Sequence, residues 1–154
     1  MSTPVTLEEL KGRVGQELGA CAWREVSQEH IDRFAEVTDD RQFIHVDPAR
    51  AKAETPFGGT IAHGFLTLSL LSALGAEVIP RLEGRRMGIN YGFDRVRFLS
   101  PVRAGARVRG RFRLMDVAMQ GGREVMIRYA VTVEIEGEPK PALAAEWLTL
   151  AVLG

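Results

Sequence analysis

The first half of the chain carries apolar residues at a helical spacing. After Ser27, a preferred N-cap residue, they recur at i, i+3 and i+4 and predict an amphipathic helix over residues 28–38. Asp47 followed by Pro48 predicts a short helical turn over residues 48–53, because proline is favoured at the first helical position. The apolar stripe of the first helix consists of Ile31, Phe34 and Ala35.

The middle of the chain, residues 64–78, is strongly apolar. Its apolar side chains occupy nearly every face of a helix, and Pro80 ends that helix. A membrane-spanning helix needs roughly 20 apolar residues, so the pattern favours a core helix surrounded by protein. The apolar residues are Phe65, Leu66, Leu68, Leu70, Leu71, Ala73, Leu74 and Val78.

The second half of the chain alternates between apolar and polar residues, which predicts β-strands. Gly121-Gly122 predicts a hairpin turn between two of them. A possible strand pair over residues 14–26 would complete the sheet. The pattern therefore predicts an α+β fold, with one buried helix wrapped by an antiparallel sheet, in a single domain over residues 1–154. The predicted strands are residues 87–98, about 108–114, 125–135 and 143–152.

Composition narrows the class of protein. The 154 residues are 45% hydrophobic and 26% charged, as expected for one globular domain with a real core. The formal net charge of zero argues against a nucleic-acid partner. Cys21 is the single cysteine, which excludes an internal disulfide and favours a reducing compartment. Residues 1–11 are polar without an apolar signal core, so we expect a cytoplasmic protein without a membrane partner.

Asp40 and His45 are the first candidates for chemistry. They lie five residues apart, on a stretch too irregular for a long helix. Phe43 and Ile44 between them are apolar, so we expect partial burial, where a carboxylate and an imidazole can hold and activate one water molecule. The alternative is a helix-end aspartate next to an ordinary surface histidine.

Gly64 is the second candidate, because it stands where the apolar helix begins. Its amide would have no partner within the helix, and a glycine lets a bulky ligand approach, so it can bind a substrate oxygen. The alternative is a glycine that only allows close helix packing. His63, just before it, is interpreted as a capping or packing residue without a chemical role.

Arginines accumulate between residues 85 and 113, where Asp94 is the one acidic residue. One interpretation is a phosphate-binding patch for a polyanion such as coenzyme A. The alternative, a solvated strand face, is favoured for the last four. We find no metal-ligand spacing, nucleophile elbow or phosphate-binding loop. The nine arginines are Arg85, Arg86, Arg95, Arg97, Arg103, Arg107, Arg109, Arg111 and Arg113.

Three segments together resemble a known family, the MaoC-like, hot-dog-fold (R)-specific enoyl-CoA hydratases, in particular the branch similar to nodulation protein N. The resemblance extends over nearly the whole chain. It implies a hot-dog fold, usually a homodimer or higher homo-oligomer, and reversible hydration of trans-2-enoyl-CoA to (R)-3-hydroxyacyl-CoA. The segments are D-R-Q-F-I-H-V-D-P from Asp40, P-F-G-G-T-I-A-H-G-F-L-T-L-S-L-L from Pro56 and N-Y-G-F-D-R-V-R-F-L-S-P from Asn90.

The resemblance also implies roles for single residues. Asp40 and His45 match the catalytic dyad, Gly64 matches the amide that binds the thioester oxygen, and Ser72 matches a serine that borders the site. Ser72, Gln42 and Phe43 are therefore expected to bind the substrate. Gln42 and Phe43 stand where better-studied members carry Asn-Pro, a departure that keeps the dyad and leaves the acyl-chain preference open.

The substrate of the implied reaction is an acyl-CoA thioester, and coenzyme A arrives as part of it, so no separate cofactor and no metal are expected. Arg95 and Arg97 are the candidates for binding its phosphates. Two other functions stay open from the sequence. One is a hot-dog thioesterase, which would direct water at the carbonyl carbon, and the other is a non-catalytic acyl-CoA-binding accessory protein.

Overall fold

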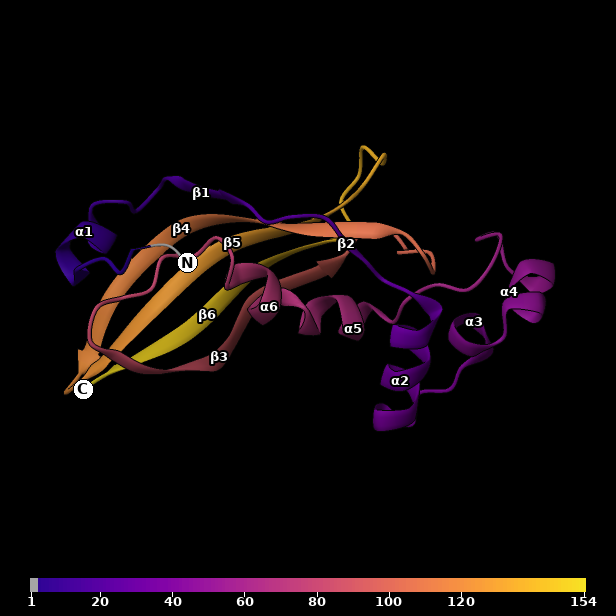
Figure 1. Cartoon of the computed structure of the whole chain (residues 1–154), viewed down its shortest axis with the longest axis horizontal. Helices are drawn as coiled ribbons and strands as arrows, with labels where there is room; N and C mark the ends of the chain where they lie inside the picture. The colour runs from indigo at the N-terminus through magenta and orange to yellow at the C-terminus, as the bar shows by residue number, and fades with distance from the viewer. Residues whose placement is uncertain (1–2) are drawn as a thin grey trace.

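The computed structural model describes residues 3–154, and one antiparallel sheet runs along the molecule (Figure 1). Within these residues the sheet has six strands in the order β1-β4-β5-β6-β3, and β2 also pairs with β4. The antiparallel sheet and the helix against it confirm the predicted α+β class. The strands are β1 (Glu17–Ala20), β2 (Arg24–Glu25), β3 (Arg85–Phe98), β4 (Arg107–Gly121), β5 (Glu124–Ile135) and β6 (Leu143–Leu153).

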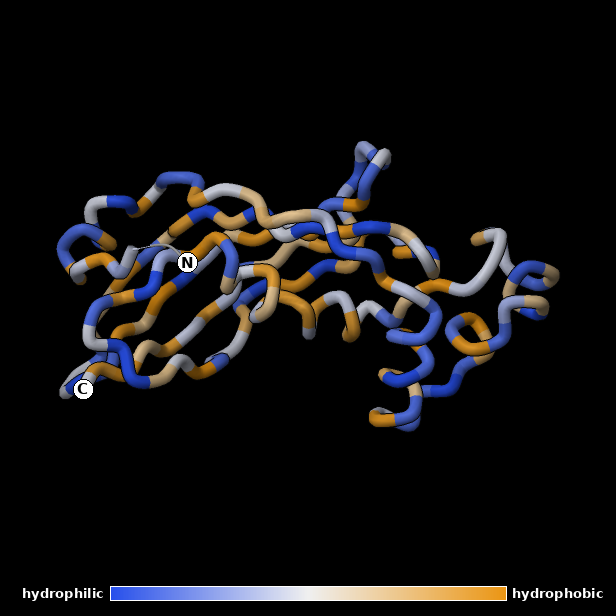
Figure 2. The backbone as a smooth tube through the Cα atoms, viewed as in Figure 1, coloured by the Kyte–Doolittle hydropathy of each residue, from blue (hydrophilic) through white to orange (hydrophobic). Residues whose placement is uncertain are grey.

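The four long strands follow from the alternation of the sequence. In β5, every second residue from Val125 to Ile135 is buried and the residues between are half-buried, so one face of the sheet forms the core. Figure 2 shows hydrophobic and more polar residues along the strands of the sheet. The turn between β4 and β5 contains Gly121 and Gly122 at φ 128° and 56°, a backbone region that glycine adopts without strain. The predicted hairpin is therefore confirmed.

Two strands do form within residues 14–26, but the prediction that they pair with each other is wrong. These strands, β1 and β2, both pair antiparallel with β4. The cause is the length of β4, whose 15 residues offer hydrogen bonds to both short strands at once. The N-terminal segment thus lies along the sheet as an edge and does not form its own hairpin.

Local capping signals explain most of the helices. Ser27 caps α2, its hydroxyl accepting a hydrogen bond from the amide of His30 at 3.2 Å, and the side chain of Asp47 caps α4 in the same way. The predicted helices over 28–38 and 48–53 are therefore confirmed. The helices are α1 (Leu7–Lys11), α2 (Gln28–Thr38), α3 (Phe43–Val46), α4 (Pro48–Glu54), α5 (Gly64–Ser69) and α6 (Leu71–Gly75).

The predicted continuous helix over residues 64–78 is wrong in two respects. It consists of two short helices, α5 and α6, that meet at Leu70. In the single chain, it is also not covered on all sides: Leu71 and Leu74 are buried against the sheet, whereas Phe65 is 66% exposed. The apolar residues on the exposed face show that burial in the sheet accounts for only part of the apolar pattern.

The break at Leu70 has a local cause. The hydroxyl of Ser69 donates to the carbonyl of Phe65 at 2.6 Å and competes with the backbone for it. The amide of Leu70 is shared between the carbonyls of Leu66 and Thr67, at 3.2 and 3.3 Å, which tightens the turn. Within residues 3–154, no helix is long and apolar enough to cross a membrane.

Candidate active site

The candidate residues gather at one end of the sheet. Helices α2, α3 and α4 lie together at the end opposite the two termini, and α5 runs from them under the sheet (Figure 1). Asp39 ends α2 in the left-handed conformation, with φ 59°, and so turns the chain sharply before Asp40. The single turn of α3 then carries His45 towards the start of α5.

His45 is the buried member of the predicted pair, with 7% of its surface exposed. Its Nδ1 lies 2.7 Å from the carbonyl oxygen of Ile61. A carbonyl only accepts, so Nδ1 carries the hydrogen and donates it, which leaves Nε2 as a free acceptor. Burial lowers the pKa of His45 below its ordinary 6.5, and the nearby His63 acts in the same direction. His45 is therefore neutral at neutral pH, as a proton acceptor must be.

Asp40 differs from the expectation of a partly buried carboxylate, because its side chain is exposed. Burial in this segment is confined to His45, with Phe43, Ile44 and Val46 half-buried around it, and the turn at Asp39 leaves Asp40 at the surface. Even so, one carboxylate oxygen of Asp40 and one ring nitrogen each of His45 and His63 lie within 4.8 Å of one another. The predicted pair is thus close enough for one water molecule to touch both.

His63 is a site residue that the sequence interpretation missed. It is 2% exposed, and its ring stacks on that of His45 with centroids 3.8 Å apart and an angle of 24° between the planes. The sequence signal was its position directly before Gly64, but proximity to His45 depends on the turn of α3.

The stacked rings do not suit a metal ion. A zinc ion lies about 2.0–2.1 Å from each ligating nitrogen, near the plane of the ring. Between two nearly parallel rings, one ion cannot lie in both planes. The Asp40, His45 and His63 cluster is better suited to binding water than to chelation.

Gly64 opens α5 directly after His63 and lies beside a groove of about 210 Å³. A Cβ atom at this position would lie 2.9 Å from the ring of Phe98, so glycine is required unless that ring moves. The first hydrogen bonds of α5 run from the amides of Leu66 and Thr67 to the carbonyl of His63, so the amide of Gly64 precedes the helical ladder. The groove is therefore lined by the residue whose amide is the candidate donor, next in sequence to His63. Its other lining residues include Thr67, Ser100 and Pro101.

Other predicted residues lie elsewhere. Ser72 is on the exposed side of α6, where the side-chain amide of Asn90 donates to its hydroxyl at 3.3 Å, and it does not line the Gly64 groove. Gln42 is exposed at the start of α3. The ring of Phe43 is covered by the guanidinium of Arg50 at 4.0 Å. The structure does not bring these predicted substrate-binding residues into the groove.

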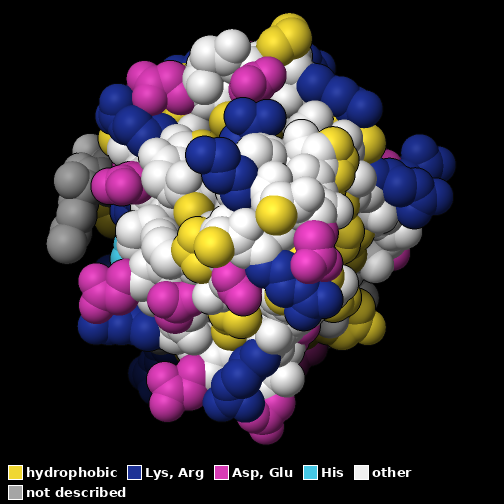
Figure 3. All heavy atoms as spheres, turned by 90° about the vertical axis from the view of Figure 1, so that its right-hand side faces the viewer, with side chains coloured by type: hydrophobic (Ala, Val, Ile, Leu, Met, Phe, Trp, Pro, Cys, Tyr) yellow, Lys and Arg dark blue, Asp and Glu magenta, His cyan; other side chains and the backbone are white. Residues whose placement is uncertain are grey.

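The arginine excess divides into two groups. Arg107, Arg109 and Arg111 lie on β4 and form ion pairs with carboxylates on β1, on β5 and directly after β5. Acidic side chains of Glu17, Glu134 and Glu136 thus neutralise them, as the solvated-face interpretation predicts. The end view of Figure 3 likewise shows acidic and basic side chains intermingled over α2, α3 and α4.

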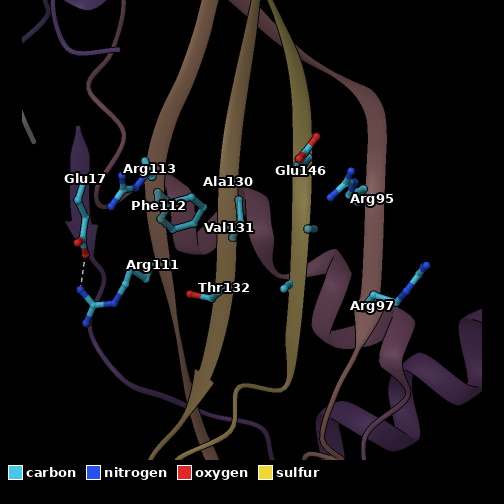
Figure 4. A pocket seen from close by; sticks show the side chains of 12 residues that line it. Glu17, Arg95, Arg97, Arg111, Phe112, Arg113, Ala130, Val131, Thr132 and Glu146 are labelled. Atoms are coloured by element: carbon cyan, nitrogen blue, oxygen red, sulfur yellow. Dashed lines mark hydrogen bonds and ion pairs between the residues drawn. The ribbon is translucent and has the colours of Figure 1, made fainter. Parts of the chain in front are cut away.

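Arg95 and Arg97 belong to the second group and line a groove of about 400 Å³ on the outer face of the sheet (Figure 4). Strand pairing places Arg95 in one row with Arg113 on β4, and Arg97 in the next row with Arg111. Within residues 3–154, Arg95, Arg97 and Arg113 have no carboxylate within 4 Å. This groove does not contain Asp40, His45 or Gly64. The floor residues between the arginines include Ala130, Thr132 and Ala144.

Comparison with known proteins identifies the family of the chain. Residues 9–138 match the family model described as MaoC like domain. The chain is 55% identical to nodulation protein N of Rhizobium leguminosarum bv. viciae, over 95% of this chain and 91% of that protein. It is 43% identical to 3-hydroxyacyl-thioester dehydratase Z of Mycobacterium tuberculosis H37Rv, over 95% of each.

A solved structure shares the fold. The unliganded R-hydratase PhaJ1 of Pseudomonas aeruginosa superimposes with a TM-score of 0.73 at 26% sequence identity, covering 92% of this chain and 83% of that chain.

Proposed function

The chain belongs to the MaoC-like dehydratase family and is a hydro-lyase, and we propose that it adds water reversibly to trans-2-enoyl-CoA, giving (R)-3-hydroxyacyl-CoA. The observation that carries this proposal is the approach of the Asp40 carboxylate and the His45 imidazole within 4.8 Å, next to the groove at Gly64. One of the solved structures with a similar fold is that of an R-hydratase, which supports the R configuration of the proposed product.

The dyad has the properties needed to orient one water molecule. His45 offers Nε2 as an acceptor because Nδ1–H is held by Ile61, and Asp40 offers a carboxylate oxygen. A water that donates one hydrogen to each has its lone pairs free for C3 of the substrate. As the C3–O bond forms, the dyad takes one proton from water, and it returns one proton to C2.

The thioester carbonyl must be polarised for this addition. We place its oxygen on the amide of Gly64, at the start of α5, where negative charge developing on the oxygen is stabilised by an N–H donor. Phe98 closes the other side of this position, since its ring lies against Gly64. Withdrawal of electrons into the carbonyl makes C3 electrophilic, and no separate cofactor or metal is needed.

Arg95 and Arg97 are proposed to bind the phosphates of coenzyme A. Arg97 directly precedes Phe98, whose ring lies against Gly64, so the two arginines lie on the strand that borders the proposed thioester site. On the outer face of the sheet, the two guanidiniums are exposed and free of carboxylates among the described residues.

A homodimer is proposed through β3. This strand lies at the end of the sheet order and pairs with β6 on one side only, so its other edge presents unpaired backbone groups. Met87, Ile89 and Tyr91 are 54%, 42% and 62% exposed along it, an unusual density of large apolar side chains. A second copy of β3, related by a two-fold axis, would cover both the unpaired backbone groups and these apolar side chains.

The proposed function is tested by following the loss of enoyl absorbance when crotonyl-CoA is the substrate. We expect turnover, with (R)-3-hydroxybutyryl-CoA as the product, and the reverse reaction from that product. Release of free coenzyme A from a saturated acyl-CoA would instead indicate a thioesterase. Binding without either reaction would indicate an accessory protein and overturn the proposal.

A further inference from the structure

His63 is held more tightly than a packing residue requires. Its ring lies between that of His45, at 3.8 Å, and that of Phe34, whose centroid is 4.9 Å away at an angle of 57°. Its Nε2 lies 2.9 Å from the backbone carbonyl oxygen of Asp40, 23 residues away in the chain. The ring thus joins the start of α5 to both members of the proposed dyad.

The hydrogen bond to Asp40 fixes the protonation of His63. Since the carbonyl only accepts, Nε2 carries the hydrogen, and Nδ1 is left as an acceptor. Within the described residues, this Nδ1 is buried and has no hydrogen-bond partner. A buried acceptor without a donor is unfavourable, so packing alone does not explain a histidine at this position. A histidine is therefore best explained by something it does for its neighbours.

Stacking also brings the imidazole of His63 close enough to act on the charge of His45. The two ring centroids are 3.8 Å apart, and after burial, His63 is a further cause that lowers the pKa of His45. Among the described residues, Asp40 and His63 are the charged or titratable groups that act on His45, while Ile61 and Gln28 bind it through uncharged hydrogen bonds.

We infer that His63 is a positioning residue of the proposed hydratase site, which fixes the main chain at Asp40 and holds the imidazole of His45 in one orientation. The inference rests on the proposed function, because it assigns His63 to the dyad of that reaction. His63 does not touch the reacting atoms and acts through Asp40 and His45.

Two substitutions separate the two effects. His63→Gln places an amide nitrogen near the position of Nε2 and keeps a donor for the Asp40 carbonyl, but removes the stacked, titratable ring. His63→Phe keeps a stacked ring but removes the donor. Phe34→Leu is the control, because it loosens the other side of His63 without changing its hydrogen bond or its stack on His45.

The measurements are the pH profile of crotonyl-CoA hydration and an NMR titration of the histidine ring nitrogens. For His63→Gln, we expect the acid limb of kcat/KM and the pKa of His45 to move upward, towards 6.5, with kcat at high pH largely kept. For His63→Phe, which also lacks the imidazole, we expect the same upward shift of the acid limb and, in addition, a kcat lower by roughly ten- to a hundredfold, because the donor that holds the Asp40 carbonyl is lost. Phe34→Leu should lower thermal stability and leave the acid limb in place.

A wild-type acid limb in His63→Gln together with a wild-type kcat in His63→Phe overturns the inference and leaves His63 as a packing residue. The NMR titration does not require activity, so it tests the inference about His63 even where the proposed function is wrong. If the wild-type protein does not hydrate crotonyl-CoA, the proposed function fails. The shift of the His45 pKa between wild type and His63→Gln then still decides whether His63 controls His45.

Discussion

Backbone carbonyls hold both histidines of the site. Ile61 accepts from Nδ1 of His45, and Asp40 accepts from Nε2 of His63. A side-chain partner can rotate or titrate, whereas a carbonyl in a packed chain does neither, so each tautomer is set by the fold itself. The two free nitrogens, Nε2 of His45 and Nδ1 of His63, are consequently acceptors, and the site has a fixed preference for donors such as water.

Asp40→Asn and His45→Ala should each lower kcat for crotonyl-CoA hydration by at least about a hundredfold, the usual scale of positioned acid–base catalysis. Asp40 is exposed, so its variant should keep wild-type stability, whereas His45→Ala removes a buried hydrogen bond and should also unfold more easily. Steady-state kinetics and thermal unfolding measure the two effects. Near-wild-type turnover in either variant would remove the proposed mechanism.

The lowered pKa of His45 predicts how stability depends on pH. Between the lowered value in the folded protein and 6.5 in the unfolded chain, the unfolded chain binds the extra proton. The free energy of unfolding should therefore fall as the pH decreases through 6.5 and level off below the folded pKa. Urea unfolding at a series of pH values tests this.

His45→Gln and the exposed His30→Gln form the matched pair for that test. The first should lose most of the dependence in this window, and the second should keep it. An identical pH dependence in wild type and His45→Gln would show that other groups cause it.

Helices α5 and α6 combine two environments in one apolar segment. Leu74 and Leu71 are 0% and 2% exposed, whereas Leu70 between the helices is only half-buried. Leu71→Ala and Leu74→Ala should each lower the free energy of unfolding by about 2–5 kcal/mol, the range for fully buried leucines. Leu70→Ala should lower the free energy of unfolding by a clearly smaller amount, because Leu70 is only half-buried. Denaturant unfolding compares the three, and equal losses would contradict the observed division of faces.

Capping residues and the alternation of apolar and polar residues were sufficient to predict the elements that depend only on neighbouring residues. The caps at Ser27 and Asp47 and the strict alternation over residues 125–135 identified α2, α4 and β5 from the sequence, because each follows from neighbouring residues. The break at Leu70 involves a serine that looked ordinary in an apolar helix. The pairing of β1 and β2 with β4 depends on a strand about 90 residues away.

The residues of the candidate site likewise divide into those that the sequence predicts and those that only the fold reveals. Asp40, His45 and Gly64 carry recognisable residue types at a recognisable spacing, and the structure brings Asp40 and His45 together beside the groove at Gly64. The role of His63 arises from stacking between residues 18 positions apart, for which the sequence holds no periodic signal. The exposure of Asp40 follows from the single left-handed residue before it, which one sequence does not reveal.

The distribution of charge over the whole sheet predicts which arginines bind coenzyme A. Replacing Arg95 and Arg97 by Ala should raise KM for crotonyl-CoA severalfold and weaken its rise with ionic strength, because exposed charges are screened within about 8–10 Å at physiological salt. Replacing Arg107 and Arg109 is the control, since Glu136 and Glu134 already neutralise them. Kinetics at several salt concentrations measure the difference.

A short enoyl thioester without phosphates provides the second control for these arginines. It should show little salt dependence with either pair of variants. An equal response of both substrates would mean that salt acts on the protein or its assembly, and Arg95 and Arg97 would then belong to the solvated face of the sheet.

The free edge of β3 predicts the assembly state of the molecule. Ile89→Lys combined with Tyr91→Lys places two charges on the edge and should convert a dimer, at twice the chain mass of 17.0 kDa, into monomers. Val37→Lys is the matched control, because Val37 on α2 is 81% exposed and lies away from β3. Sedimentation velocity distinguishes the two species. A monomeric wild type, or a dimer that survives both lysines, would show that the apolar edge of β3 is not the contact between copies.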